Sequence, residues 1–260
     1  MPLTIATWNI NSVRLRIDNL ARLIKDASPD VIALQEIKCP DEAYPRDAIA
    51  ALGYPFQHAR GMKGYNGVAI LSRLPFAETQ GRDFCARQDC RHAGVKFANG
   101  IELHNFYVPA GGDIPDPEAN DKFAHKLRFL EELADWSAGE HRRRAKRILV
   151  GDLNVAPLPN DVWSHKALLD VVCHTPGEVS RLGALQATAE WVDVLREFHP
   201  PEQKLYTWWS YRARDWRESD RGRRLDHIWV TPPLRSSLRS ARVLKDARDW
   251  PQASDHVPVV

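Results

Sequence analysis

Four short polar segments, spread from one end of the chain to the other, carry residue types that could cleave a phosphodiester with the help of a metal ion. They read WNINS at residues 8–12, LQE at 34–36, GDLN at 151–154 and SDH at 254–256. Each adjoins an apolar run that reads as a buried strand. Polar and charged groups at such positions are costly unless they are exposed, paired or bound to a cation. Together the four segments therefore indicate a catalytic site.

Two of these residues suit a magnesium ion. Magnesium takes one or two protein carboxylates and leaves its other positions to water and substrate phosphate. Glu36 follows an apolar run, and Asn9 offers an amide oxygen at the end of the preceding strand. Taken alone, Glu36 reads as an ordinary loop glutamate, and Asn9 and Asn11 read as turn formers. We favour function because the two strands are expected to be neighbours.

Asp152 and Asn154 lie two residues apart after the apolar run 148–151. Residues at this spacing in an extended segment point the same way, so both side chains would face one phosphate. The carboxylate could handle a proton, and the amide could stabilise developing charge. The alternative is a simple turn after a strand, which we consider the weaker interpretation.

Asp226 and His256 form a possible pair, although they are distant in sequence. A carboxylate bonded to one imidazole nitrogen fixes the tautomer and raises the basicity of the other nitrogen. His227 is a competing partner for this aspartate. Tyr107 ends another apolar run, and its hydroxyl could donate to a phosphate oxygen, although an aromatic core residue is the simpler interpretation.

Residues 206–224 interleave aromatic side chains with arginines and read YTWWSYRARDWRESDRGRR. Cations for phosphates and flat faces for bases or sugars are what a nucleic-acid strand requires. Acidic residues dilute the charge of this segment. A second basic run, at 142–147, precedes a strand and reads as a solvated turn.

Short apolar strands alternate with amphipathic helices, which predicts an α/β layered fold. Strand–helix–strand patterns with polar strand ends occur in both halves, so we expect two similar halves packed into one domain over residues 1–260. Ser12 is the expected cap of the first helix. The expected strands are 3–10, 31–34, 67–71, 101–108, 147–150, 225–230 and 257–260, and the expected helices are 13–24, 47–52, 118–136 and one within 182–198.

Composition excludes several classes of protein. The chain has 260 residues, 43% of them hydrophobic and 27% charged, and no apolar run long enough to span a membrane. Its beginning lacks the features of a signal peptide, so we expect a cytoplasmic protein. The net charge of +2 argues only weakly for a polyanionic partner. The four cysteines form no disulfide framework or zinc pattern, and no triphosphate-binding, dinucleotide-binding or serine-hydrolase motif is present.

These segments resemble the exonuclease III family of apurinic/apyrimidinic endonucleases, within the DNase I-like endonuclease/exonuclease/phosphatase superfamily. The four polar segments are typical of the superfamily. LQEIK at 34–38, YVP at 107–109, YTWWSYR at 206–212 and RLD at 224–226 are typical of the narrower family. The resemblance covers essentially the whole chain and implies a four-layer α/β sandwich of two packed mixed β-sheets flanked by helices.

The resemblance also implies a role for each site residue. The catalytic groups would be Tyr107, Asp152, Asn154, Asp226 and His256. The groups around Mg²⁺, for which Mn²⁺ could substitute, would be Asn9, Glu36, Asp152, Asn154, Asp255 and His256. The groups that contact DNA would be Asn11, Trp208, Arg212 and Leu225, with Trp208 and Leu225 lining a pocket for a flipped, base-less deoxyribose. Whether Asp152 or His256 is the base stays open.

The implied function is hydrolysis of duplex DNA 5′ to an abasic site, leaving a 3′-hydroxyl, with 3′→5′ exonuclease or 3′-end cleaning activity by a monomeric enzyme. Two departures from the family pattern bear on this expectation. Ala110 follows the YVP segment where many relatives have a polar residue, and Arg223 stands where some have an aromatic. The alternatives are a phosphoesterase for inositol phosphates or phospholipid headgroups on the same scaffold, and a DNA-binding protein without catalysis.

Overall fold

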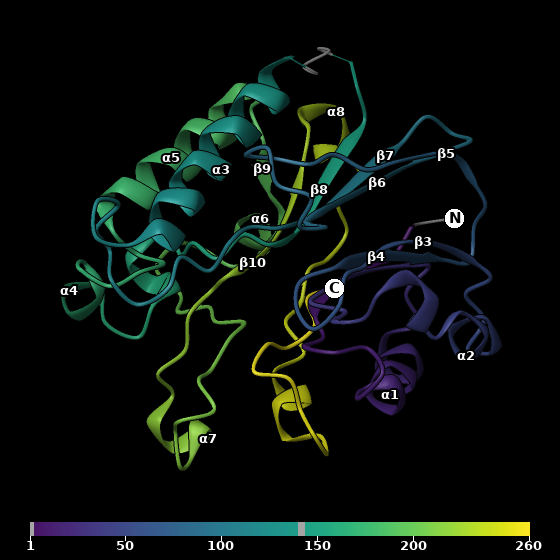
Figure 1. Ribbon diagram of the computed structural model, residues 1–260, viewed down its shortest axis with the longest axis horizontal. Helices are drawn as coiled ribbons and strands as arrows, with labels where there is room; N and C mark the ends of the chain where they lie inside the picture. Colours follow the sequence, from purple (N-terminus) through teal and green to yellow (C-terminus); the bar gives the residue numbers. More distant parts are fainter. Residues whose placement is uncertain (1–2, 140–143) are drawn as a thin grey trace.

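Two β-sheets lie face to face in the computed structural model, which describes residues 3–139 and 144–260 (Figure 1). The first sheet has four strands, in the order β1 (Ile5–Asn9), β2 (Val31–Gln35), β4 (Val68–Ser72) and β3 (Phe56–Arg60). The second has six strands, in the order β5 (Phe76–Gln80), β6 (His92–Phe97), β7 (Glu102–Tyr107), β8 (Arg147–Asp152), β10 (Asp226–Val230) and β9 (Val192–Asp193).

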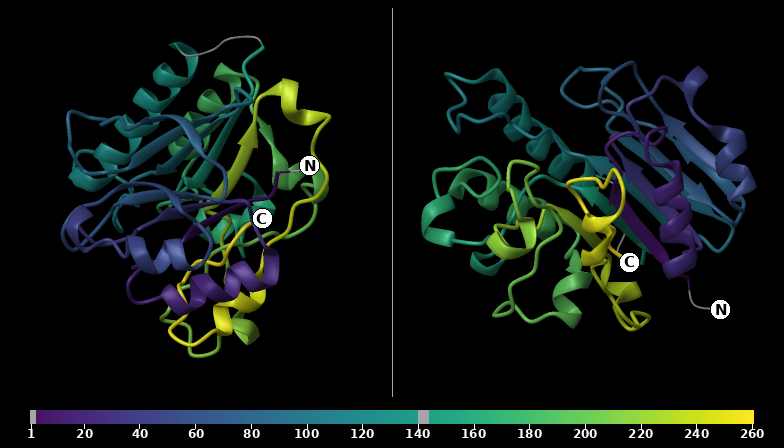
Figure 2. Two further views of the ribbon diagram at one scale, coloured as in Figure 1. Left: turned by 90° about the vertical axis from the view of Figure 1, so that its right-hand side faces the viewer. Right: turned by 90° about the horizontal axis from the view of Figure 1, so that it is seen from below.

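Helices cover the outer face of each sheet, as Figures 1 and 2 show. Helices α1 (Ile17–Ala27) and α2 (Arg46–Ala51) lie on the four-stranded sheet, and α3 (Asp121–Gly139) and α5 (Pro176–Thr188) lie on the six-stranded sheet. The predicted four-layer α/β sandwich is confirmed. The shorter helical elements are α4 (His165–Leu168), α6 (Val194–Phe198), α7 (Trp216–Ser219), α8 (Pro232–Arg235), η1 (Asp41–Ala43), η2 (Pro159–Asp161) and η3 (Lys245–Asp249).

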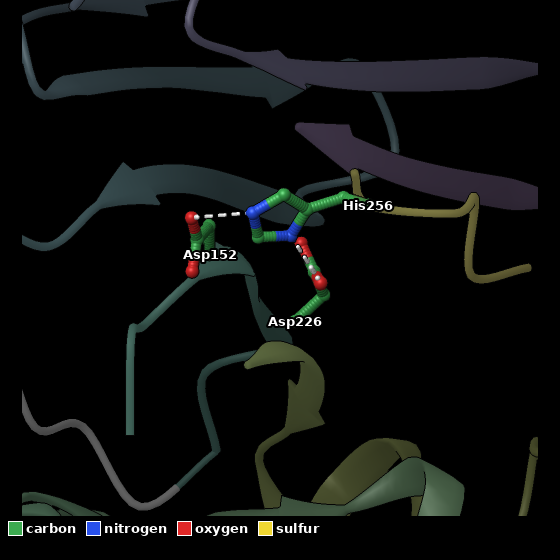
Figure 3. Close-up of side chains that lie close together, drawn as sticks. All are labelled: Asp152, Asp226 and His256. Carbon is green, nitrogen blue, oxygen red and sulfur yellow. Dashed lines mark hydrogen bonds and ion pairs between the residues drawn. The ribbon is translucent and has the colours of Figure 1, made fainter. Parts of the chain in front are cut away.

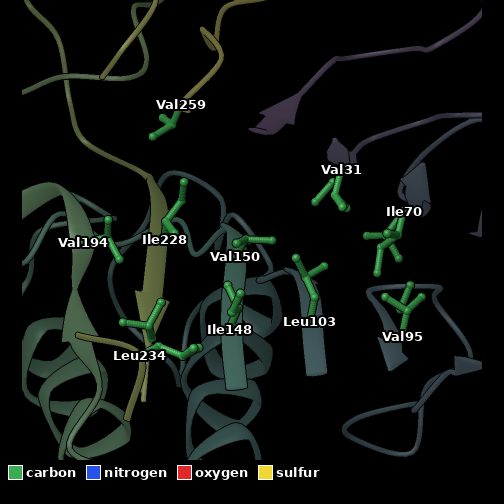
Figure 4. Close-up of a cluster of buried hydrophobic side chains, with 14 of the residues drawn as sticks. Val31, Ile70, Val95, Leu103, Ile148, Val150, Val194, Ile228, Leu234 and Val259 are labelled. Carbon is green, nitrogen blue, oxygen red and sulfur yellow. The ribbon is translucent and has the colours of Figure 1, made fainter. Parts of the chain in front are cut away.

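The central strands of both sheets are buried on both faces, which explains the unbroken apolar runs in the sequence. Side chains alternate along β2: Val31 points to the core between the sheets and Ile32 to the core under the helices. Val150 and Leu149 divide in the same way on β8. Figure 4 shows the inter-sheet core, where Val31 and Ile70 of one sheet face Leu103 and Val150 of the other.

The two expected halves are present as two parallel strand–helix–strand units. β1 and β2 pair in parallel around α1, and β7 and β8 pair in parallel around α3. The carboxyl ends of parallel strands lie at one edge of a sheet, where loops are exposed above a rigid scaffold. Asn9 and Glu36 therefore emerge together, as do Tyr107 and Asp152.

Several local expectations were wrong. Ser12 does not cap the first helix, which begins at Ile17 after Arg16 and has no side-chain cap. Four strands, β3, β5, β6 and the two-residue β9, were not predicted, and residues 257–260 make only isolated bridges, through Val259, to Thr7 and Val243. Gly53 does follow a helix, with the positive φ of 92° that favours glycine. Among the described residues, no helix is both long and apolar enough to cross a membrane.

The basic run at 142–147 divides into three parts. Residues 142–143 lie outside the described ranges, while Arg144 and Lys146 are exposed, as expected for a solvated turn. Arg147 is buried, so the expectation was wrong for this residue. Its guanidinium carbon lies 4.7 Å from the ring centre of Trp136 and 5.4 Å from that of Trp191. Cation–π contact under α3 explains why an arginine can begin a central strand.

Candidate active site

Asn9 connects the two sheets at the edge where the polar strand ends meet. Its side-chain nitrogen donates to Glu36 Oε1 at 2.9 Å and to Asp152 Oδ2 at 2.9 Å. Asn9 ends β1, Glu36 follows β2 with a positive φ of 50°, and Asp152 ends β8. A single buried amide therefore holds a carboxylate of each sheet at a fixed separation.

Glu36 receives three hydrogen-bond donors. Besides Asn9, the Tyr107 hydroxyl donates to Oε1 at 2.8 Å and the Lys38 ammonium contacts Oε2 at 2.7 Å. Burial opposes ionisation of this carboxyl, but the bonds from Asn9, Lys38 and Tyr107 outweigh it and lower its pKa. Glu36 is therefore a carboxylate at neutral pH, and it remains partly exposed to solvent.

His256 lies between two aspartates, as Figure 3 shows. Its Nδ1 is 2.8 Å from Asp226 Oδ2, and its Nε2 is 3.6 Å from Asp152 Oδ2. Asp226 is itself fixed by the Thr207 hydroxyl, which donates to Oδ2 at 2.6 Å. Asp152 and Asp226 are paired residues of neighbouring strands β8 and β10. The hypothesised Asp226–His256 contact is thus present in the structure.

His227 does not take the place of His256. Its Nε2 lies 2.9 Å from the carbonyl oxygen of Val155, and its Nδ1 lies 3.2 Å from Arg224. Burial and the nearby Arg224 charge lower its pKa to about 4, so it is a neutral structural residue.

The protonation states of Asp152 and His256 are set jointly. Burial raises the pKa of Asp152 to about 7; the nearby imidazolium opposes this shift and the charge of Asp226 adds to it. Burial alone would lower the pKa of His256, but Asp226 and Asp152 together raise it to about 10. At neutral pH the imidazole is therefore a cation, and Asp152 can exchange a proton.

The last polar segment is fastened directly to β1. The Trp8 indole nitrogen donates to the His256 carbonyl at 3.0 Å, and the Ser254 hydroxyl donates to the Asn9 carbonyl at 2.7 Å. Thr7 and Val259 exchange backbone hydrogen bonds of 2.9 and 3.0 Å. These contacts bring His256 beside residues that lie more than 200 positions earlier in the chain.

Asn154 and Asp255 have neighbours that limit their orientation. The Asn154 side-chain nitrogen donates to the Val108 carbonyl at 2.9 Å, and its backbone nitrogen donates to Asp152 Oδ1 at 3.0 Å. Asp255 accepts from the Asn11 amide at 3.1 Å and from the Trp208 indole at 3.0 Å. Asp255 thus connects the acidic site to the aromatic segment.

Trp208 and Leu225 form an apolar wall beside His256. Trp208 forms backbone bridges with both His256 and Arg223, and its ring packs on the cluster that contains Leu225. Arg212 is exposed, and its backbone nitrogen bonds to the Ser210 hydroxyl. The structure therefore brings Asn11, Trp208 and Leu225 to the site. Arg212 follows Trp208 closely in the sequence, but its side chain lies at the exposed surface.

Comparison with known proteins gives a consistent result. The sequence matches the Endonuclease/Exonuclease/phosphatase family over residues 6–256. The chain belongs to this family. It is 28% identical to exodeoxyribonuclease III of Haemophilus influenzae over 262 residues, which covers 97% of each protein.

Two solved structures of similar architecture refine the placement within the family. An AP endonuclease from Archaeoglobus fulgidus superimposes with a TM-score of 0.91 and 32% identity, over 99% of this chain and 97% of that one. A 3′ phosphatase from Neisseria, bound to a product DNA hairpin, gives 0.90 and 29%, over 99% and 97%. The resemblance to exonuclease III-type enzymes is confirmed.

Three polar residues of this family member were not assigned a role from the sequence. Lys38 donates to Asn11 Oδ1 at 2.6 Å as well as to Glu36, and Thr207 fixes Asp226. Both lie in segments that marked the family, so position was an available signal. Lys126 donates to the carbonyl of Asn154 at 2.7 Å and contacts the buried Glu178. It lies within a helical pattern that gave no such signal.

The oxygen atoms at and around Glu36 are suitable ligands for a hard cation. Carboxylate oxygens of Glu36 and Asp152 flank the Asn9 amide, and Lys38 already places a cation between Glu36 Oε2 and the Asn11 amide oxygen. Oxygen donors of this kind are those that magnesium prefers. Among the described residues, Asp152, Asp226 and His256 also place ligand atoms within 4.8 Å of one another. The imidazolium makes this second group a poorer cation site than the oxygens around Glu36.

Proposed function

We propose that this chain hydrolyses the phosphodiester 5′ to an abasic site in duplex DNA, leaving a 3′-hydroxyl, and also clears blocked 3′ ends. It is a hydrolytic nuclease of DNA repair. The observation that carries the proposal is the Asp152–His256–Asp226 array, fixed by Asn9 to the Glu36 carboxylate of the other sheet. Relatives named as an exodeoxyribonuclease III, an AP endonuclease and a DNA-bound 3′ phosphatase support DNA as the substrate.

Asp152 is the proposed base. Its pKa of about 7 lets it accept the proton of an attacking water, whereas His256, with a pKa of about 10, already holds its proton. Water attacks phosphorus in line and gives its proton to Asp152. The bond between phosphorus and the 3′-oxygen breaks, the 3′-oxygen takes up a proton from solvent to become the 3′-hydroxyl, and no covalent enzyme intermediate forms. The alternative, in which His256 is the base, requires a neutral imidazole. The two neighbouring carboxylates, Asp226 and Asp152, instead keep this imidazole protonated.

His256 and Tyr107 are the proposed phosphate donors. The imidazolium, oriented by Asp226, can donate from Nε2 to a non-bridging oxygen as negative charge develops. Burial and Glu36 hold the pKa of the Tyr107 hydroxyl well above the usual value, so it keeps its single proton. The hydroxyl donates this proton to Glu36 Oε1 in the structure and would turn from Glu36 to donate it to the phosphate. Asn154 would stabilise the same phosphate without adding a negative charge.

Glu36 and Asn9 would hold the divalent cation, with Asp255 nearby. A bound Mg²⁺ supplies charge neutralisation at the phosphate and at the leaving oxygen. Mn²⁺ has the same preference for oxygen ligands and would substitute.

Asn11, Trp208, Leu225 and Arg212 are the proposed DNA contacts. The wall of Trp208 and Leu225 would receive the flipped deoxyribose of an abasic site. Extrusion costs least where no base is stacked or paired, so this wall provides a physical source of selectivity. Arg212, exposed on the aromatic–arginine segment, would contact a flanking phosphate.

A duplex labelled at its 5′ end and bearing one abasic residue tests the proposal. We expect a single cut at the lesion with Mg²⁺, none with EDTA, and a product that a polymerase can extend. Turnover of inositol phosphates or phospholipid headgroups without cleavage of DNA would instead support the lipid phosphoesterase alternative. Metal-independent binding without cleavage in Mg²⁺ or Mn²⁺ would support a non-catalytic DNA-binding protein.

A further inference from the structure

Arg223 has unusual surroundings for a partly buried guanidinium. Its Nη1 donates to neutral acceptors, the Val172 carbonyl at 3.4 Å and the Cys173 sulfur at 3.2 Å. Its Nε is buried without a hydrogen-bond partner in residues 3–139 and 144–260. Its Nη2 makes no hydrogen bond in these ranges either, and the side chain is only partly buried, so Nη2 is the nitrogen that a ligand can reach. In the same ranges Arg223 forms no salt bridge, whereas its neighbour Arg224 is paired with Asp161 and Asp193.

The guanidinium of Arg223 lies on the apolar wall beside the catalytic residues. Its central carbon is 5.1 Å from the ring centre of Trp208. Arg223 and Leu225 are two positions apart in the extended segment that leads into β10, so their side chains share one side. Trp208 bridges to Arg223 on one flank and to His256 on the other. A sugar seated on this wall, with its phosphate at His256, would therefore lie within the reach of Arg223.

An abasic deoxyribose offers a group that matches this unpaired donor. Loss of the base leaves a ring-closed sugar with a hydroxyl at C1′, where the base nitrogen was attached. That hydroxyl is a neutral acceptor, and it meets no polar partner on a purely apolar wall. The Nη2 group of Arg223 has no acceptor among the described residues, and the hydroxyl of the substrate would supply one. Sites built to bond a substrate hydroxyl discriminate strongly against analogues that lack it.

We propose that Arg223 is a specificity-determining residue that donates a hydrogen bond to the C1′ hydroxyl of the abasic deoxyribose. The inference rests on the proposed function and goes further, because it assigns recognition of the lesion to one side chain. It also distinguishes two substrates that an apolar wall alone would treat alike: the natural abasic site and its tetrahydrofuran analogue, which has hydrogen at C1′.

The test compares kcat/KM of the wild type and Arg223→Met on three DNA substrates. These are a natural abasic site, the tetrahydrofuran analogue and a 3′-phosphate end, which has no sugar beyond the scissile phosphate to reach the wall. We expect the wild type to cut the natural site about tenfold faster than the analogue, as for one hydrogen bond to a charged donor. Arg223→Met should lose this preference by slowing only on the natural site. Removal of the 3′-phosphate should not change.

Two further variants control the experiment. Arg73 follows β4 at the end of the strand that is remote from Glu36, and its guanidinium lies 5.3 Å from the Tyr54 ring. Arg73→Met removes this guanidinium and should leave all three rates unchanged. Arg223→Gln keeps an amide donor at the position and should retain part of the preference. It also serves as the test if Arg223→Met fails to fold.

Three outcomes would overturn the inference. Equal rates of the wild type on both abasic substrates would show that the hydroxyl is not read. Faster cutting of both by Arg223→Met would show that the arginine obstructs the wall. An equal loss on all three substrates would show general phosphate attraction. Absence of any cleavage by the wild type, including removal of the 3′-phosphate, would instead refute the proposed function itself.

Discussion

Asp152 and Asp161 are nine residues apart and almost fully buried, yet their environments shift their pKa values in opposite directions. Burial raises the pKa of Asp152 to about 7, and the charges of Asp226 and Glu36 add to this rise. Burial also disfavours the charge of Asp161, but Arg224 and Arg196 outweigh it and lower the pKa. Arg224 holds Asp161 with bonds of 2.8 and 2.9 Å.

The difference separates a carboxylate that holds the fold from one that can do chemistry. Asp161 is bound by two guanidinium groups, so it cannot give or take a proton near neutral pH. Asp152 has an amide and an imidazolium at longer range, so its charge is only partly compensated. Burial alone is therefore a poor guide to function, and the identity of the partner is a better one.

Asp152→Asn gives the largest expected effect. It removes the proposed base while keeping the shape of the side chain, so kcat should fall by about 10²–10⁴-fold. The free energy of unfolding should stay unchanged or rise, because a poorly compensated buried charge is lost. Rates on abasic DNA and urea unfolding measure the two effects. Near-normal turnover by this variant would refute the assignment of Asp152.

Asp161→Asn should reverse that pattern. It leaves the buried Arg224 without one of its two counter-charges, which lowers the free energy of unfolding by about 3–5 kcal/mol. The folded fraction at low temperature should retain activity within a few-fold of the wild type. Glu78→Gln breaks the exposed pair with Lys96 and, as the control, should cost less than about 1 kcal/mol. Equal stability losses in the two variants would contradict the comparison.

Glu36→Gln should weaken cation binding without abolishing catalysis. An amide keeps one oxygen donor but no charge, so the Mg²⁺ concentration for half-maximal activity should rise by about 10–100-fold. A titration of activity with Mg²⁺ measures the shift, and EDTA should abolish activity in both proteins. An unchanged titration curve would remove Glu36 from the cation site.

The smallest expected effect is the pH dependence of the free energy of unfolding, to which Asp152 and Asp161 contribute with opposite signs. A raised folded-state pKa means that the native protein holds the Asp152 proton more tightly, so this contribution is lost as pH rises from 3.8 towards 7. Relative to Asp152→Asn, the wild type should lose about 1 kcal/mol for each pH unit in this window. The lowered pKa of Asp161 gives the opposite sign: its contribution is present above pH 3.8 and is lost as pH falls further. Urea unfolding in EDTA at several pH values measures both slopes, and slopes of one sign would be inconsistent with the proposed difference.

Local patterns predicted the layers and most of the site. Polar residues at the ends of apolar runs lie together within each sheet, because parallel strands align their carboxyl ends: Asn9 with Glu36 in one sheet, and Tyr107 with Asp152 in the other. The sequence pattern did not predict strands β3, β5 and β6, because polar residues interrupt their apolar runs, as at Gln57 and Glu78.

Long-range partners could not be read from the sequence. The Arg147 guanidinium looked like part of a solvated turn, since nothing local indicates that Trp136 and Trp191 enclose it. The function of Lys126 depends on meeting Asn154 across 28 positions. Contacts of this kind arise only in the folded chain, and the spacing of residues in the sequence does not indicate them.

The fastening of residues 254–259 to β1 has a consequence for protein synthesis. A ribosome that has released only the first 250 residues has already made Asn9, Glu36 and Asp152, but it has not yet made His256. The backbone exchange between Thr7 and Val259 and the Trp8 bond to His256 form only when this late segment emerges. A nascent or truncated chain would thus hold the acidic half of the site without its imidazolium, and cutting of DNA would begin only after the chain has closed on itself.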